Sequence, residues 1–197
     1  MKLVIASDNK NKIREIKQIL HGFFDEMLSM REAGIDMDIV EDGSTFSENA
    51  LKKAEGIFRI ANADAVLADD SGLVVDALNG APGVYSARFA GEGHNDEANN
   101  KKLLKLMENV PQNLRTCRFE TAVALLRKGK PPLIATGTCE GRLLFEPKGN
   151  NGFGYDPIFY TETYKMSFAQ CTAEQKNAVS HRGNALKALR KMLEDGQ

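Results

Sequence analysis

The sequence has few of the residues that build disulfide scaffolds and zinc sites. It contains three cysteines and three histidines among 197 residues. An odd number of cysteines argues against a disulfide framework, and no CxxC or Cys/His pair has the spacing of a zinc site. The histidines His21, His94 and His181 form no HExxH or similar metal-binding pair. We therefore expect reduced, mostly buried cysteines. These are Cys117, Cys139 and Cys171.

An excess of charge of one sign and a long apolar run are missing too. The 26 Lys and Arg residues nearly balance the 27 Asp and Glu residues, for a net charge of −1. Proteins that coat DNA or RNA are usually strongly basic, so we expect no nucleic-acid partner, whereas a local basic cluster would suffice for a small anion. The longest apolar run, about residues 122–126, is far shorter than the ~20 residues of a membrane helix. The N-terminal segment MKLVIASDN turns polar too soon for a secretory signal. These absences predict a soluble, cytoplasmic protein without a membrane partner.

Strand and helix patterns alternate along the chain, and no linker divides it. Apolar residues make up 42% of the sequence, enough for a substantial core. Thr45 with Glu48, and Thr172 with Gln175, have the form of helix-capping boxes. The alternation predicts one α/β domain over residues 1–197, with antiparallel pairing in its second half. The predicted strands are 2–6, 65–68, 73–78, 119–127, 132–139 and 140–146, and the predicted helices are 10–20, 46–57, 96–107 and 185–193.

Two polar segments follow predicted strands. Residues 7–12 (SDNKNK) lead into a predicted helix, whose first backbone N–H groups and positive dipole end favour an anion. Lys12 and Ser7 would add a charge and a hydroxyl, although an ordinary capped turn is the commoner use of such a segment. Asp69 and Asp70 follow an apolar strand, and their side chains should point in different directions. Carboxylates at a strand end either hold Mg²⁺ or cap a turn, and the two readings are about even here.

Two further segments offer groups that suit a nucleotide base. In residues 149–157 (GNNGFGYDP), glycines permit close approach to a ligand, Phe153 and Tyr155 could stack on a planar base, and Asp156 could accept from a ring N–H. Aromatic rings that fill a core are the alternative. Lys176 and residues 180–183 (SHRG) offer donors for keto oxygens or phosphate. A lone basic cluster of this kind is more often a solvated face.

The four segments together indicate a nucleoside triphosphate site with phosphate, metal and base contacts. The chain closely resembles the inosine/xanthosine triphosphate pyrophosphatases, house-cleaning enzymes for non-standard purine nucleotides. The resemblance runs in the family's order from residue 3 to about 190. Its matching stretches are SDNKNK, TFSENALKKA, ADDSGLVVDALNGAPGVYSARFAG, GFGYDPIF and EQKNAVSHRGNALKAL.

The resemblance implies an α/β fold with a mixed sheet, two lobes around a long central cleft, and a homodimer. It also implies hydrolysis of ITP, dITP, XTP or dXTP to the monophosphate and pyrophosphate with Mg²⁺, which Mn²⁺ can replace. Such a mechanism needs no covalent intermediate, which agrees with the lack of a nucleophilic Cys or a Ser–His–Asp set.

The resemblance also implies roles for individual residues. Asp70 would be the metal ligand and the proton acceptor for the attacking water. Many relatives carry paired acids just before the glycine of EDG, whereas this chain has Val40 followed by Glu41 and Asp42. Either Glu41 is the second metal ligand, or Mg²⁺ rests on Asp70 and phosphate oxygens. The phosphates would contact Ser7, Asp8, Asn9, Lys10, Asn11, Lys12 and Ser71, and the nucleotide, mainly its base, would contact Phe153, Gly154, Tyr155, Asp156, Lys176, His181 and Arg182.

Two other functions remain open at this point. Related house-cleaning pyrophosphatases act on modified pyrimidine or other triphosphates with the same chemistry, although SHR and FGYDP favour a purine. A nucleotide-binding regulatory module that hydrolyses nothing is the second alternative. The acidic pair and Lys12 argue against it, because a pure binder has no need of a base beside the metal.

Overall fold

The computed structural model describes residues 1–93 and 95–196, so His94 lies outside the described residues. None of the described helices is long and apolar enough to cross a membrane. The helices are α1 (Lys10–Ile19), α2 (Phe46–Phe58), α3 (Asp96–Leu106), α4 (Ala173–Val179) and α5 (His181–Asp195). The strands are β1 (Lys2–Ile5), β2 (Glu26–Ser29), β3 (Ala65–Val75), β4 (Thr116–Arg127), β5 (Lys130–Leu143), β6 (Phe159–Thr161) and β7 (Met166–Ser167).

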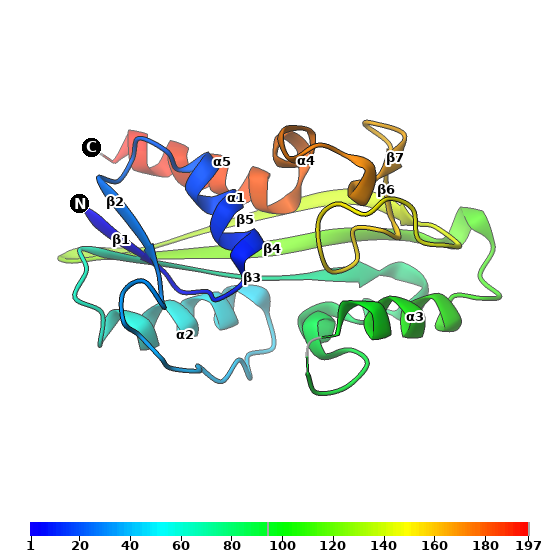
Figure 1. Ribbon diagram of the computed structural model, residues 1–197, viewed down its shortest axis with the longest axis horizontal. Coiled ribbons are helices and arrows are strands. Elements are labelled where there is room, and N and C mark those ends of the chain that lie inside the picture. The colour runs from blue at the N-terminus through cyan, green and yellow to red at the C-terminus, as the bar shows by residue number, and fades with distance from the viewer. Residues whose placement is uncertain (94, 197) are drawn as a thin grey trace. The chain divides into compact units, whose positions relative to one another are not determined.

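The described strands form one mixed sheet in the order β2-β1-β3-β4-β5-β6-β7 (Figure 1). β1 pairs in parallel with β2 and β3, while β5 pairs antiparallel with β6, and β6 with β7. Only residues 128 and 129 separate β4 from its neighbour β5, which makes this pair a hairpin. The predicted α/β fold with a mixed sheet, antiparallel in its second half, is therefore confirmed.

The chain divides into two compact units. Unit 1 comprises Met1–Asp70, Thr121–Gly137 and the segment from Arg182 onward, and unit 2 comprises Ser71–Glu120 and Thr138–His181. Each unit draws on separate stretches of sequence, and strands β3, β4 and β5 contribute residues to both. The long cleft between lobes that the resemblance implies stays a prediction.

Side chains of the unit 1 strands alternate between two apolar layers. Leu3, Ile5 and Leu67 pack with α1 and α5 in one cluster, and Val4 and Val66 pack with α2 in another. Figure 1 shows α1 and α5 on one face of these strands and α2 on the other. Because successive strand residues point to opposite faces, the register of β3 decides which layer each later side chain enters.

Several sequence predictions need correction at element boundaries. The predicted strand 65–68 and the first part of the predicted strand 73–78 belong to the single strand β3, so the acidic pair lies within a strand rather than after one. The prediction was wrong for residues 76–78, which form a short 3-10 helix. The predicted strands 132–139 and 140–146 likewise merge into one strand, β5, which ends at Leu143, so the prediction was wrong for residues 144–146. The charges of Asp69 and Asp70 suggested that a strand ends before them. The strand continues through both residues because their carboxylates are buried and bind partners.

The two capping predictions have different outcomes. Thr172 and Gln175 form the full reciprocal box at the start of α4. Thr45 accepts the backbone N–H of Glu48 at the start of α2, but the carboxylate of Glu48 accepts from Ser44 rather than from the backbone of Thr45. The C-terminal helix begins at His181, four residues before the predicted start at Ala185, so His181 and Arg182 lie in its first turn, while Ser180 caps the end of α4.

Unit 2 contains a buried arginine with an unusual set of partners. Arg115 is 1% exposed and donates to the backbone carbonyls of Leu143 at 3.0 Å, Met107 at 2.5 Å and Leu144 at 2.8 Å. Its guanidinium also lies 4.1 Å from the centre of the Phe145 ring. The side chain therefore joins the end of α3 to the end of β5.

Replacing Arg115 by Met should lower the free energy of unfolding by about 3 kcal/mol, because several buried carbonyls lose a charged donor. Arg118→Met is the matched control, since Arg118 is half-buried and pairs with Asp76 and Glu120 on the surface. That variant should lose less than about 1 kcal/mol. Urea denaturation measures both, and equal losses would show that Arg115 does not hold unit 2 together.

Candidate active site

The acidic pair of β3 lies just beyond the parallel part of the sheet. β1 ends at Ile5, which is opposite Leu67, so Asp69 and Asp70 extend past the carboxyl end of β1. The turn of residues 7–9 leaves β1 at the same edge and leads into α1. The carboxyl edge of parallel strands is the usual location of ligand sites in α/β proteins.

Asp69 lies at the centre of a buried group of charges. Its Oδ2 accepts hydrogen bonds from Nε and Nη2 of Arg182, both at 3.0 Å, and lies 3.2 Å from Nζ of Lys12. Nη1 of Arg182 donates to Oε2 of Glu15 at 2.6 Å. Asp69 and Arg182 are each 1% exposed. The four charges come from α1, β3 and α5, so they tie these elements together.

Burial and charge act in opposite directions on these groups. Burial alone would raise the pKa of Asp69, but Lys12, Arg182 and Lys53 outweigh it and hold that pKa well below its ordinary value. For Lys12 burial prevails, and its pKa is lowered despite the nearby Asp69. Arg182 remains charged, because the two carboxylates raise its pKa against the effect of burial. Asp69 is therefore an anion that is fixed by its partners.

Asp70 points to the opposite face, as the strand alternation predicts. Its Oδ2 accepts a hydrogen bond from Nδ2 of Asn49 on α2 at 2.9 Å. Burial raises the pKa of Asp70, and the negative charge of Glu41 raises it further, while the bond from Asn49 opposes them. Asp70 is thus the more basic of the two carboxylates, and Glu41 lies near enough to repel it.

Lys53 on α2 links Glu41 to strand β3. Its ammonium forms an ion pair with Glu41 and donates to the backbone carbonyl of Asp69 at 3.2 Å. The carboxylate of Glu41 and the neighbouring charge of Asp69 raise the pKa of Lys53 despite its burial. Sequence analysis missed Glu15, Asn49 and Lys53. The spacing of Asn49 and Lys53, one helical turn apart in TFSENALKKA, is the signal that could have found the last two.

The turn before α1 is an internally bonded cap. The side chain of Asn9 accepts from the backbone N–H groups of Asn11 at 3.0 Å and Lys12 at 3.2 Å, and Ser7 accepts from the N–H of Asn9. Two of the N–H groups expected to bind an anion are thus occupied by Asn9. Lys12 reaches Asp69, and the exposed Asp8 has no neighbour at the acidic pair in the contacts described.

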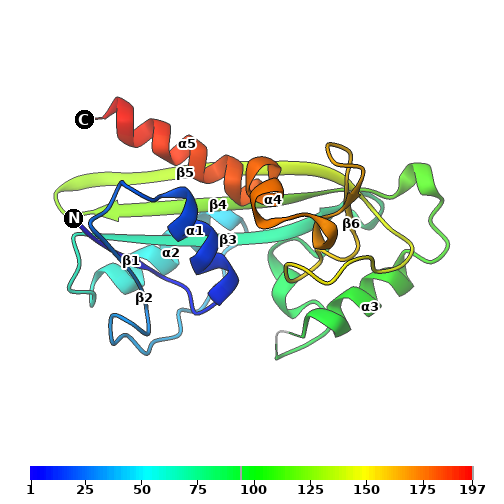
Figure 2. The same cartoon turned by 45° about the horizontal axis from the view of Figure 1, so that its top comes forward.

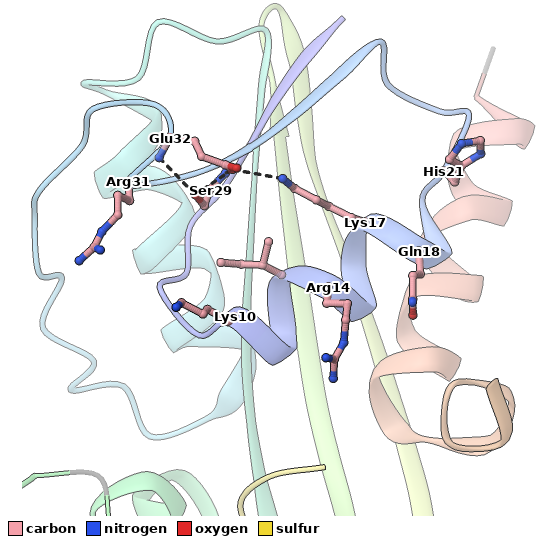
Figure 3. A pocket seen from close by; sticks show the side chains of 9 residues that line it. Lys10, Arg14, Lys17, Gln18, His21, Ser29, Arg31 and Glu32 are labelled. Atoms are coloured by element: carbon pink, nitrogen blue, oxygen red, sulfur yellow. Dashed lines mark hydrogen bonds and ion pairs between the residues drawn. The ribbon is translucent and has the colours of Figure 1, made fainter. Parts of the chain in front are cut away.

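Lys10 lies in a different place from Lys12. It lines a hollow of about 600 Å³ beside α1, together with Arg14, Lys17 and Arg31 (Figure 3). In that hollow, Nζ of Lys17 donates a hydrogen bond to Oε2 of Glu32 at 3.1 Å. The structure therefore does not bring Lys10 to the Asp69 cluster, and its predicted phosphate contact stays a prediction.

In unit 2, the glycine-rich loop forms a second polar cluster. Oδ2 of Asp156 accepts from Nζ of Lys176 at 2.6 Å and from the backbone N–H of Phe153 at 2.9 Å. The ammonium of Lys176 lies 4.4 Å from the centre of the Phe153 ring. Gly152 has a φ of +78°, and a side chain there would collide with the Asp156 carboxylate. The loop thus needs glycine at this position to hold the cluster.

The same loop is anchored to α3. The backbone N–H of Gly154 donates to Asp96 at 2.7 Å, and its carbonyl accepts from Asn100 at 2.9 Å. Figure 2 shows the loop beside α3, and Phe153 and Gly154 line a hollow of about 630 Å³ there. These bonds fix the backbone of the segment that the sequence predicts to bind a base.

Tyr155 and His181 are packed into unit 2. Tyr155 is 4% exposed and its hydroxyl donates to the carbonyl of Ser86 at 2.8 Å, which favours the core-filling alternative for this ring. The ring of His181 stacks on Phe119 with centroids 4.7 Å apart. Ser71 follows Asp70 in β3 and is half-buried. The predicted nucleotide contacts of Tyr155, His181 and Ser71 stay predictions.

The comparisons with known proteins agree over nearly the whole chain. A sequence profile of the Ham1 family matches residues 3–192. A dITP/XTP pyrophosphatase from Desulforamulus reducens is 49% identical over 193 residues, which cover 98% of this chain and 96% of that protein. One from Clostridium perfringens is 47% identical over 197 residues, with 98% and 97% covered. The solved structure of the Staphylococcus aureus Ham1 protein matches at a TM-score of 0.88 and 42% identity, and covers 100% of both chains.

The pKa of Asp69 predicts how stability depends on pH. Because its folded pKa lies below the ordinary value of 3.8, its contribution is complete above that value and is lost as the pH falls below it. Asp69→Asn leaves buried cations without their partner and should cost about 3–5 kcal/mol at pH 7. The difference from the wild type should shrink below about pH 4. Urea denaturation from pH 7 to 2.5 measures it, and a constant difference would contradict this account.

Proposed function

The chain belongs to the Ham1 family, and we propose that it hydrolyses non-standard purine nucleoside triphosphates, such as dITP and XTP, to the monophosphate and pyrophosphate. The observation that carries this proposal is the buried carboxylate of Asp70, which Asn49 holds at 2.9 Å while Lys12 and Lys53 contact the adjacent Asp69. A general base beside cations is what attack of water on a polyphosphate requires. The names of the relatives, dITP/XTP pyrophosphatase, supply the substrate class.

The carboxylates of unit 1 fit a divalent cation. Asp70 and Glu41 present hard oxygen ligands, and their mutual repulsion would be relieved by a cation at both. Among the described residues no group of three or more His, Cys, Asp or Glu side chains could hold a metal ion. We assign the ion to Asp70 and Glu41, with phosphate oxygens and water as its remaining ligands, and Mg²⁺ or Mn²⁺ as its identity. When bound, it would neutralise phosphate charge and make a water molecule more acidic.

Individual residues of the chain then have separate roles in the reaction. Water attacks the α-phosphorus, the bond to the bridging oxygen of the pyrophosphate breaks, and Asp70 takes the proton of the water. Lys12 and Lys53 offset the negative charge that develops on the departing pyrophosphate. We assign the phosphates to the segment of residues 7–12 and to Ser71. The bond from Asn49 holds Asp70 in place while it accepts the proton.

We assign the base to the unit 2 cluster. The Phe153 ring offers a stacking face, Lys176 a donor for a keto oxygen, and Asp156 an acceptor for a ring N–H. Hypoxanthine and xanthine present such a keto oxygen, whereas adenine presents an amino group and would leave buried donors unpaired. His181, Gly154 and Tyr155 of the same unit would support this cluster. Arg182 binds Asp69 and Glu15 in unit 1, and its predicted contact with the base stays a prediction.

We further propose one catalytic domain over residues 1–197, acting in the cytoplasm as a homodimer. The match covers 96% of the Desulforamulus reducens relative, and the two units are interleaved in sequence, which supports a single domain. The dimer and the location rest on the resemblance, and light scattering of the purified protein tests the dimer.

The substrate class is tested by pyrophosphate release from dITP, dXTP, dATP and dUTP with Mg²⁺. We expect efficiencies with dITP and dXTP at least ~10²-fold above that with dATP, because the donors of the base site meet a 6-keto oxygen on hypoxanthine and xanthine but an amino group on adenine. A preference for dUTP would support the pyrimidine alternative. No release from any of the four would support a binding module.

Asp70→Asn should lower kcat by ~10²–10⁴-fold, because an amide is nearly isosteric but accepts no proton. The fold should persist, since the change removes a carboxylate whose charge burial disfavours. Asp76→Asn is the control, because Asp76 belongs to unit 2 and its carboxylate binds Arg118 and Thr116, and it should change kcat less than about twofold. A mild loss of kcat in Asp70→Asn would refute its role as the base.

A further inference from the structure

Asn49 makes two hydrogen bonds that join separate segments of unit 1. Its Nδ2 donates to Oδ2 of Asp70 at 2.9 Å, and its Oδ1 accepts from the backbone N–H of Gly43 at 2.7 Å. The residue is 1% exposed. One amide therefore links the carboxylate at the edge of β3 to the segment that carries Glu41.

At Gly43, the segment that carries Glu41 packs closely against α2. A Cβ at this residue would lie 2.6 Å from Oδ1 of Asn49 and 2.9 Å from Cβ of Glu48, so a side chain there would displace the amide or the helix. The absence of a side chain lets the backbone N–H of Gly43 reach Asn49. The junction between the Glu41 segment and α2 is thus a close contact of fixed geometry.

Lys53 adds a second link on the same helix. It lies one turn after Asn49 on α2 and contacts Glu41 and the carbonyl of Asp69. Both side chains thus connect the Glu41 segment with β3, but they differ in kind. Lys53 acts mainly through its positive charge. Asn49 instead donates a directed hydrogen bond to one oxygen of the Asp70 carboxylate, and this bond fixes the plane of that carboxylate.

We propose that Asn49 is a positioning residue, which orients the Asp70 carboxylate and fixes the Glu41 segment relative to it for a divalent cation. This inference rests on the proposed function. The bond from Asn49 holds one oxygen of the Asp70 carboxylate, and the bond from Gly43 holds the backbone two residues after Glu41 against the same amide. The amide thereby prepares the two ligands before the cation arrives, which lowers the cost of ordering them.

Asn99 offers a matched control elsewhere in the chain. It is 3% exposed on α3, where its Nδ2 donates to the carbonyl of Ala87 at 3.1 Å and its Oδ1 accepts from the N–H of Ala90 at 2.7 Å. It therefore has the burial and the two-sided bonding of Asn49, but both of its partners are backbone groups. A purely structural asparagine should behave like Asn99.

The experiment compares Asn49→Ser and Asn49→Leu with Asn99→Ser and Asn99→Leu. Serine is small and polar, so we expect the serine variants to fold even where the leucine variants do not. We expect the Asn49 variants to need at least ~10-fold more Mg²⁺ for half-maximal turnover of dITP, and to bind Mn²⁺ at least ~10-fold more weakly by electron paramagnetic resonance. Mn²⁺ binding is measured with and without a non-hydrolysable dITP analogue. The Asn99 variants should lower Tm by a similar amount, with both metal constants within twofold of the wild type.

The Mn²⁺ measurement separates this inference from the proposed function. A wild type that binds Mn²⁺ but releases no pyrophosphate from dITP would refute the proposed substrate. Mn²⁺ binding by the Asn49 and Asn99 variants would still test the positioning role in that case. Unchanged Mn²⁺ binding in Asn49→Ser, or equal losses in the Asn49 and Asn99 variants, would overturn the positioning role. A wild type that binds no Mn²⁺ in either condition would overturn it as well.

Discussion

The ion pairs of the Asp69 carboxylate are the interaction on which unit 1 depends. Moving a carboxylate, a guanidinium and an ammonium out of water is costly, and the cost is offset only where the charges meet with good geometry. Arg182 binds Asp69 through two nitrogens and Glu15 through a third, while Lys12 completes the group. Because these residues come from α1, β3 and α5, the position of Lys12 at the sheet edge is fixed by the same contacts that hold the helices to the strand.

Strand alternation gives the two adjacent aspartates different chemistry. Asp69 faces α1 and α5, where cations lower its pKa, and Asp70 faces α2, where burial and Glu41 raise its pKa. A one-residue shift in the register of β3 would exchange these environments, since every side chain would change face. The layer packing of Leu67 and Ala68 on opposite faces therefore also determines which carboxylate can act as a base.

The sequence was sufficient for the longer helices and strands and the main polar segments, because apolar spacing and capping residues act locally. It did not indicate the short strands β2, β6 and β7. It was insufficient for the interior of β3, since charges within a strand resemble a strand end until their partners are known. Asp69 and Arg182 are 113 residues apart, and no local pattern reports a contact of that kind. Asn49 was hidden for a different reason, because an asparagine in a helix ordinarily faces solvent and only the tertiary fold buries it against Asp70.

The charges of unit 1 also bear on how a polyphosphate would bind there. Around the acidic pair, the cations Lys12, Lys53 and Arg182 face the carboxylates Glu15, Glu41, Asp69 and Asp70, so the anions exceed the cations by one. Arg182 is already matched by two of these carboxylates and contributes little net attraction to a phosphate. A triphosphate alone would thus meet a group of charges that does not attract it. In the proposed function, the divalent cation supplies the missing positive charge, and its two carboxylate ligands explain why a site for a polyanion contains so many acids.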